Sequence, residues 1–189
     1  TMDYIQYRTL SKVSETTSVN WKRTASIPEG IEKPVLMADE DSTTVFGSKI
    51  LRKNIREIEF VKVKKEKVPS GAWDVSEDKK KTIQAWTEST DKGLILKIGS
   101  ENGVYANPNC KSLFSGYSNV KKIEFNHLFD TSKAICMEYM FYECGELEDI
   151  DVSRFNTGNV TDMACMFAFD NKLKKLDMSQ FDTGKVTDM

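Results

Sequence analysis

Apolar and polar positions in the second half of the chain recur with a period of 26 residues. Residues 155–163 read Phe-Asn-Thr-Gly-Asn-Val-Thr-Asp-Met, and residues 181–189 match them at seven of nine positions. One period earlier the pattern begins again at Phe129, and before it the register slips by one residue. Such a period is typical of stacked repeats, because a single short repeat cannot bury its own apolar face.

Each repeat begins with a Leu-x-x-Leu-x-Leu-x-x-Phe pattern, as in residues 147–155. Its alternating apolar positions predict a short strand, and the polar Asn-Thr-Gly that follows predicts a turn. We therefore expect short parallel strands at Ile123, Ile150 and Leu176, one in each repeat.

The second part of the repeat predicts a short helix. Thr161 and Asp162 are residue types that favour a helix start. Met163, Met166 and Phe167 follow at helical spacing and share one face. Together the two parts predict an α/β solenoid of right-handed strand–loop–helix rungs, resembling leucine-rich repeats.

Residues 112–189 should hold about three of these repeats, the last truncated at Met189, and the native protein should continue with more. The apolar positions that recur within the repeats form the predicted core. They are Ile123, Phe125, Phe129, Met137, Met140, Phe141, Leu147, Ile150, Val152, Phe155, Val160, Met163, Met166, Phe167, Leu173, Leu176, Met178, Phe181, Val186 and Met189.

The first half lacks the period and is predicted to be an α+β N-terminal cap over residues 31–111. Within it, Phe46-Gly47 followed by Ile-Glu-Phe at residues 58–60 resembles Phe114 followed by Ile-Glu-Phe at residues 123–125, which predicts a degenerate repeat within residues 43–63. The apolar runs 83–89 and 94–98 flank a Gly-containing loop and predict a β-hairpin. Residues 1–30 are polar and are expected to form a linker or part of a preceding segment.

The repeat resembles that of the BspA-like family of leucine-rich-repeat bacterial surface proteins, which joins Val-Thr-Asp-Met to a following Met-Phe. Trp-Asp-Val-Ser at residues 73–76 and Val-Tyr-Ala-Asn at residues 104–107 are similar to that family's N-terminal region. The pattern departs at residues 134–136, where Ala-Ile-Cys replaces Val-Thr-Asp. The resemblance implies a secreted, surface-displayed protein that acts in cell adhesion.

Composition and charge narrow the function further. Of the residues, 39% are hydrophobic and 30% charged, and the net charge of −2 provides no basic field for nucleic acid. No apolar run approaches the roughly 18 residues of a membrane span. The single histidine, His127, lies at the one-residue insertion, and its isolation removes most nucleophile–base pairs. We therefore expect no enzyme activity, no cofactor and no metal.

The cysteines are too scattered to predict a zinc site, and we expect them as small residues within the repeats. They are Cys110, Cys136, Cys144 and Cys165. Because Cys110 and Cys136 are almost in register, they are the pair to test for a disulfide.

Two charge patterns leave alternatives open. Asp149 and Asp151 point to one face of the predicted strand, as calcium ligands or a glycosidase pair would. Asp177 repeats Asp151 one period later, but Lys175 falls on Asp149 and follows Lys174, which favours cross-repeat charge pairing on a solvated face. The basic run at residues 61–68 predicts a strand with outward lysines, with a basic contact patch as the alternative.

The leading hypothesis is an extracellular binding or adhesion module whose repeats contact a protein or glycan of the host or a neighbouring cell. A structural spacer of a larger surface protein is the alternative, and a hydrolase with its site near Trp73 or Trp86 is a third. End-to-end self-association through the last repeat is a further possible contact.

Overall fold

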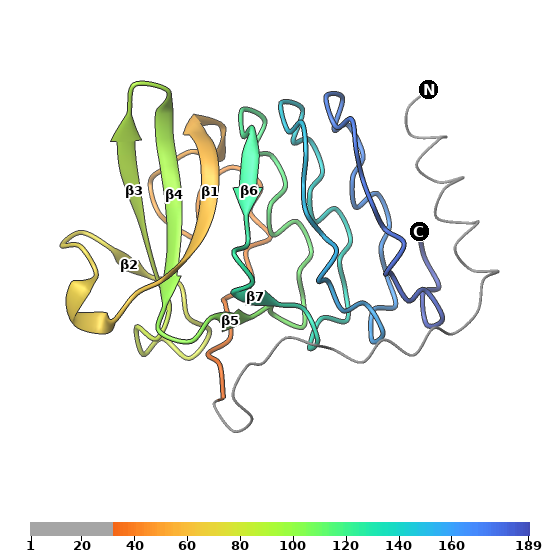
Figure 1. Ribbon diagram of the computed structural model, residues 1–189, viewed down its shortest axis with the longest axis horizontal. Helices are drawn as coiled ribbons and strands as arrows, with labels where there is room; N and C mark the ends of the chain where they lie inside the picture. The colour runs from red at the N-terminus through yellow and green to blue at the C-terminus, as the bar shows by residue number, and fades with distance from the viewer. Residues whose placement is uncertain (1–31) are drawn as a thin grey trace.

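Figure 1 shows the computed structural model, which describes residues 32–189. These residues contain seven short strands and two single turns of 3-10 helix. In chain order they are η1 (Arg52–Asn54), β1 (Ile55–Lys62), η2 (Lys65–Lys67), β2 (Trp73–Asp74), β3 (Gln84–Thr90), β4 (Gly93–Ser100), β5 (Val104–Tyr105), β6 (Lys122–Glu124) and β7 (Phe129–Asp130). The linker predicted at residues 1–30 lies outside the described residues. Among residues 32–189 no helix is long and apolar enough to cross a membrane.

A five-stranded sheet in the order β2-β3-β4-β1-β6 joins the first half of the chain to the repeats. Strands β3 and β4 form the predicted hairpin, with Thr90 opposite Gly93. Strand β1 lies parallel to β4 on one side and to β6 on the other. Ile58 of β1 pairs with Ile123 of β6, which is the alignment of the sequence echo.

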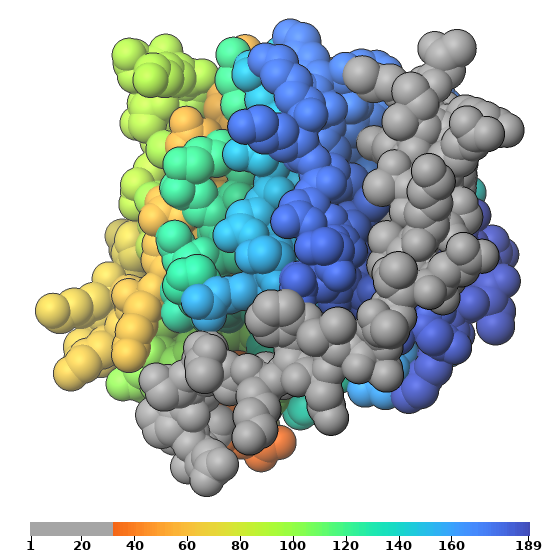
Figure 2. All heavy atoms as spheres, turned by 45° about the vertical axis from the view of Figure 1, so that its right-hand side comes forward, coloured from red at the N-terminus to blue at the C-terminus, as the bar shows by residue number. Residues whose placement is uncertain are grey.

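Three rungs continue the stack from this sheet, and we define them as residues 109–135, which contribute β6, 136–161 and 162–187. Parallel bridges join Asn109 to Cys136, Cys136 to Asp162, and Asp162 to Asp188, one rung apart each time. Figure 2 shows the stacked chain as adjacent bands of colour across one face.

A buried threonine hydroxyl ties each rung to the next. The Thr131 hydroxyl accepts the main-chain N–H of Asn156 at 2.7 Å and donates to its carbonyl oxygen at 3.0 Å. Thr157 makes the same pair of bonds to Asp182, at 2.8 and 3.0 Å. Both threonines are 1% exposed. Because each hydroxyl satisfies two main-chain groups of the following rung, this column fixes the register of the stack.

The predicted α/β solenoid with a helix in each rung is wrong, because residues 32–189 are strands and turns without an α-helix. The backbone explains the difference. Cys165 and Phe169 have φ of 53° and 64°, and Tyr139 and Glu143 one rung earlier have 54° and 60°. A positive φ leaves the right-handed helical region, so residues 163–169 fold as successive turns that no helix continues.

Of the three predicted strands, only that at Ile123 forms, as β6. Near Ile150 and Leu176 a single parallel bridge joins the two rungs instead. A local turn accounts for the shortening, because Asp151 accepts the main-chain N–H of Ser153 at 3.0 Å directly after Ile150. A side-chain bond of this kind competes with extension of a strand.

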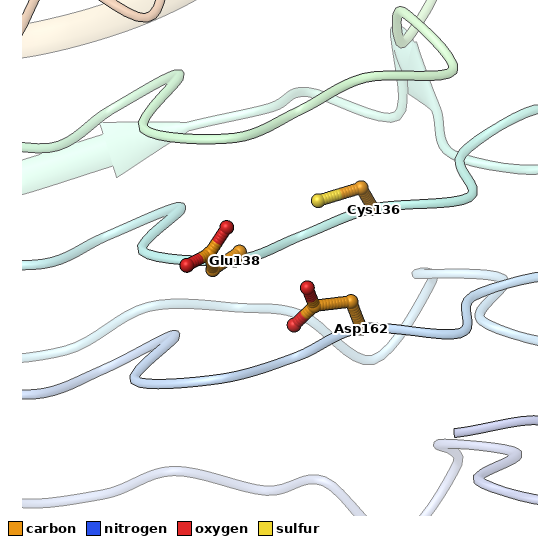
Figure 3. A group of neighbouring side chains, drawn as sticks. All are labelled: Cys136, Glu138 and Asp162. Atoms are coloured by element: carbon orange, nitrogen blue, oxygen red, sulfur yellow. The ribbon is translucent and has the colours of Figure 1, made fainter. Parts of the chain in front are cut away.

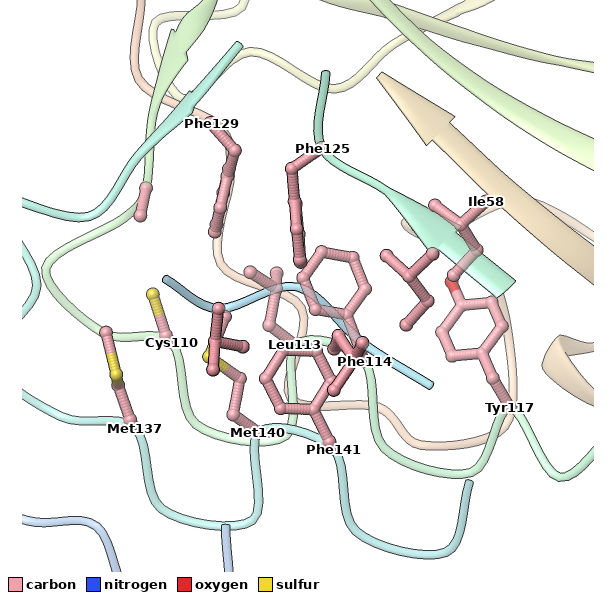
Figure 4. Packing of buried hydrophobic residues seen from close by; sticks show 14 of the residues in the cluster. Ile58, Cys110, Leu113, Phe114, Tyr117, Phe125, Phe129, Met137, Met140 and Phe141 are labelled. Atoms are coloured by element: carbon pink, nitrogen blue, oxygen red, sulfur yellow. The ribbon is translucent and has the colours of Figure 1, made fainter. Parts of the chain in front are cut away.

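The apolar core runs without a break from the cap sheet into the rungs, as Figure 4 shows for its central part. Phe114, Phe141 and Phe167 stack as a column, with ring centroids 5.5 and 5.2 Å apart. Phe60 of β1 meets Phe114 edge-on at 6.3 Å. The cap and the repeats therefore share one core, and the rungs do not stand alone.

The repeat period locates the core residues well. All of the predicted core positions are buried except Leu176, Val186 and Met189, which are partly buried against the same cluster. The side-chain columns thus survive although the backbone between them differs from the prediction. Burial depends on which residues recur, and turns can present the same residues to the core as a helix would.

A buried arginine pins the cap to the first rung. Arg52 is fully buried and pairs with the carboxylate of Asp39 at 2.8 Å. It also donates to four main-chain carbonyl oxygens, those of Asp39, Thr44, Ser112 and Ser115. Its guanidinium lies 5.0 Å from the ring centroid of Tyr117. These contacts connect segments about 60 residues apart in the chain.

Candidate functional site

Three aromatic side chains, Tyr139, Tyr142 and Phe169, form a continuous surface feature that we call the aromatic strip. The rings of Tyr139 and Tyr142 meet edge to face at 5.2 Å, and those of Tyr142 and Phe169 do the same at 5.2 Å. Phe169 is 51% exposed. The edge-to-face contacts hold the rings against one another, so the strip is a preformed apolar surface across the second and third rungs.

The strip occupies backbone positions that do not favour aromatic residues. Phe169 and Tyr139 have φ of 64° and 54°, and the first rung has Gly116, with φ 73°, at the position of Phe169. A bulky residue in this region costs about 1–3 kcal/mol. A half-exposed ring recovers only part of that cost by burial. The positive φ recurs at this position in all three rungs, so it belongs to the turn of the repeat, and what distinguishes Phe169 is the half-exposed aromatic ring placed there.

Carboxylates lie beside the rings. Glu138 pairs with Lys111 of the first rung at 2.7 Å, and the Lys111 ammonium lies 6.0 Å from the ring centroid of Tyr139. Glu143 is exposed and follows Tyr142 directly. Partial burial and the Glu143 carboxylate both raise the pKa of the Tyr142 hydroxyl, so this tyrosine stays neutral at physiological pH. The strip is thus an aromatic surface with an acidic border.

A cluster of possible metal ligands, shown in Figure 3, lies on two adjacent rungs. The donor atoms of Cys136, Glu138 and Asp162 are within 4.8 Å of one another. Burial, Asp162 and Glu138 raise the pKa of the Cys136 thiol, which keeps it protonated. Glu138 is engaged by Lys111. Asp162, predicted to lie at a helix start, accepts the main-chain N–H of Ala164 at 2.9 Å in a turn instead. Glu138 and Asp162 thus each have a partner in the fold without an ion.

Of the acidic pair that the sequence suggested as calcium ligands or a glycosidase pair, Asp149 forms a parallel bridge with Lys175 of the next rung, and Asp151 takes part in a local turn. Asp151 and Asp177 each accept a hydrogen bond from the main-chain N–H two residues later, which lowers the pKa of both carboxyls. The cross-rung charge pairing is present nearby, with Lys174 3.2 Å from Glu148. This face therefore carries solvated ion pairs between rungs.

The other sequence candidates have local structural settings. His127 is exposed, with φ 59°, in the turn that absorbs the one-residue insertion. Trp86 is 9% exposed and donates to Glu88 at 3.1 Å. Trp73 is partly buried, and its indole N–H is buried without a hydrogen-bond partner in the described structure. None of these side chains belongs to the aromatic strip.

Cys110 and Cys136 are separate thiols on adjacent rungs. Cys110 is buried and donates to the carbonyl oxygen of Asn107 at 3.0 Å, and burial raises its pKa to about 12. In the basic run, β1 ends at Lys62 and η2 follows, so the predicted strand forms only in part. The lysines of that run are exposed.

Sequence reasoning did not find the aromatic strip. The signal that could have revealed it is position within the repeat, because Tyr139, Tyr142 and Phe169 are aromatic residues that fall outside the recurring core positions. A repeat places such residues on its outer surface, since its core columns are already filled. Their mutual contact depends on the two left-handed positions, which residue type alone does not reveal.

Comparison with known families covers the stacked rungs. Residues 108–189 match the family described as "Mycoplasma protein of unknown function, DUF285". The matched segment begins one residue before the first rung. No leucine-rich-repeat or BspA-like family matches, so the resemblance inferred from the repeat motif is corrected to this family of undescribed function. No curated protein and no solved structure matches the chain.

Proposed function

We propose that this protein is a binding module that contacts a macromolecular partner through the aromatic strip. The observation that carries the proposal is Phe169, a half-exposed phenylalanine in left-handed backbone conformation, in edge-to-face contact with Tyr142. Exposed aromatic residues are enriched at the energetic centres of protein interfaces. Because the rings are already in contact with one another, binding requires little ordering of side chains.

The alternative is a spacer that holds other parts of a larger protein apart. The threonine column and the cross-rung ion pairs favour it, because both reinforce the stack and neither needs a ligand. A spacer gives no reason for a half-exposed phenylalanine in contact with a tyrosine of the neighbouring rung, so we rank it second. Display at the cell surface stays a prediction of the sequence. Antibody labelling of intact against permeabilised cells tests it.

The test screens the full chain against arrays of purified extracellular proteins and glycans. Tyr142→Ala and Phe169→Asn are the strip variants, and asparagine is chosen because it tolerates positive φ. Leu51→Asn is the matched control, since Leu51 is an exposed apolar residue of the cap. We expect ligands whose binding both strip variants abolish and the control retains. Binding that all variants retain, or no ligand at all, would contradict the proposal.

A further inference from the structure

The protein holds one of its own lysines with the same chemistry that the strip presents. The Lys111 ammonium lies 2.7 Å from a carboxylate oxygen of Glu138 and 6.0 Å from the ring centroid of Tyr139. The carboxylate neutralises the charge, and the aromatic face attracts the cation through its quadrupole. Lys111 is 39% exposed in this position, so the pairing forms at the surface of the molecule.

The same combination occurs a second time, around Tyr105 of β5. Lys33 pairs with Asp130 at 2.7 Å and lies 5.0 Å from the centroid of the Tyr105 ring. Lys133 lies 3.9 Å from that centroid. Pairing of an aromatic ring and a carboxylate is therefore a recurrent way in which this chain binds an ammonium group.

A third aromatic ring and carboxylate, those of Tyr142 and Glu143, bind no cation within the described residues. Glu143 lies next to Tyr142 in the chain, and the Tyr142 ring contacts Phe169 at 5.2 Å. Among residues 32–189 no lysine or arginine forms a salt bridge with Glu143, although it is exposed. The wider surface has the same sign, since residues 112–189 contain 13 acidic and eight basic residues. A cationic group is the complement of this surface.

We propose that Tyr142, Glu143 and Phe169 form a docking site for a lysine or arginine side chain of a partner polypeptide. The inference rests on the proposed function and names the class of partner. Tyr142 and Phe169 contact the aliphatic part and the charged head of the incoming side chain, and Glu143 pairs with its charge. Because one exposed contact of this type is weak, the partner segment brings neighbouring basic residues to the acidic border of the strip.

The test is an NMR titration of the full chain with a synthetic 12-residue peptide of alternating lysine and serine. The same peptide with every lysine acetylated is the probe control, because acetylation removes the charge and keeps the length. We expect the lysine peptide to shift the signals of Tyr142, Glu143 and Phe169, and the acetylated peptide to leave them unchanged. Raising the salt concentration weakens the binding, as screening of exposed charges requires.

Two variants test whether the charge of Glu143 contributes to binding of the lysine peptide. Glu143→Gln is expected to weaken lysine-peptide binding about threefold, the size of one exposed charge pair. Asp91→Asn removes the same charge from the β3–β4 turn of the cap and should leave binding unchanged. Equal effects of both variants, or shifts confined to other acidic residues, would overturn the inference.

The peptides also separate this inference from the proposed function. Equal binding of the lysine and acetylated peptides at the strip would refute the cationic partner and leave a binding role for the strip. Absence of any shift at the strip with either peptide refutes the docking site. The proposed function itself fails only if the protein and glycan arrays also return no ligand that depends on the strip.

Discussion

Removal of the Arg52 side chain tests whether the cap and the rungs fold as one unit. Arg52 is fully buried and makes an ion pair with Asp39 and four hydrogen bonds to carbonyl oxygens. Asp39 is itself only 6% exposed, and burial raises its pKa in spite of the opposing effect of Arg52. Arg52→Ala therefore leaves a buried carboxyl and several main-chain carbonyl oxygens without their hydrogen-bond donor.

The magnitude follows from what is left behind. Removing one partner of a buried ion pair costs about 3–5 kcal/mol, and each buried unsatisfied carbonyl adds to that cost. A domain of this size is stable by about 5–15 kcal/mol, so Arg52→Ala should remove a large fraction of the free energy of unfolding. Asp39→Asn should cost less, because the arginine keeps its four carbonyl acceptors.

The assay is urea unfolding followed by tryptophan fluorescence and by circular dichroism. All three tryptophans precede the rungs in the chain, so coincident transitions with the two probes indicate one cooperative unit. Lys172→Ala is the control, because its ion pair with Glu146 is exposed and contributes at most about 1 kcal/mol. If Arg52→Ala costs no more than Lys172→Ala, the reasoning about the buried pair is refuted.

Three further predictions concern stability and are read from the same unfolding assay. Thr157→Val should cost about 1–3 kcal/mol by removing the two hydrogen bonds between a buried hydroxyl and the main chain of Asp182. Thr183→Val should cost much less, because the Thr183 hydroxyl forms no side-chain hydrogen bond in the described structure. Equal costs would count against the threonine column. Burial raises the pKa of Asp170 to about 8, above its ordinary value of 3.8, so its contribution to the free energy of unfolding is largest at acidic pH and declines as the pH rises from about 4 to about 8. Asp170→Asn should abolish this decline, which is on the order of a few kcal/mol. An unchanged pH profile would contradict the assignment. Gly116→Ala should destabilise the protein by about 1–3 kcal/mol, because the φ of Gly116 is 73° and a Cβ would lie 2.4 Å from the Ser42 carbonyl oxygen. Gly158→Ala should be tolerated, because the nearest atoms to its Cβ would lie at 3.5 Å. The reverse order of costs would refute the close approach.

The sequence predicts the repeat period and the core columns because both depend on which residues recur. Phe141 and Phe167 stack at 5.2 Å as that recurrence requires. The β3–β4 hairpin is predictable for a similar reason, since two apolar runs flank a turn that contains Gly93. In both cases a local pattern and the burial that it permits lead to the same structure.

The helix prediction is wrong because apolar residues at helical spacing can also be buried by a backbone that is not helical. Met163 and Met166 are both buried, as a helix would place them, yet Cys165 between them has positive φ. The residue types of Cys165 and Phe169 do not predict a left-handed conformation, which is most common in glycine and asparagine. Stacking on the neighbouring rungs decides it, through bonds such as that from the Tyr139 N–H to the Ala164 carbonyl oxygen.

The site was less predictable than the fold, because a surface has no periodicity that identifies it. The cross-rung pairing of Lys174 with Glu148 follows from residues one period apart. The aromatic strip instead combines Tyr139 and Tyr142 of one rung with Phe169 of the next, at positions that are not equivalent. Its formation depends on three-dimensional proximity that the repeat alone does not specify.

The measurement that tests the central claim most directly is the affinity of one ligand from the arrays for the wild-type chain and for Phe169→Asn, measured by isothermal titration calorimetry. A ring at the centre of an interface contributes enough that its loss should weaken binding at least about tenfold, or 1.4 kcal/mol. The account predicts that loss with a melting temperature no lower than that of the wild type. An affinity within about twofold of wild type, with the variant folded, would show that the aromatic strip is not where this protein binds.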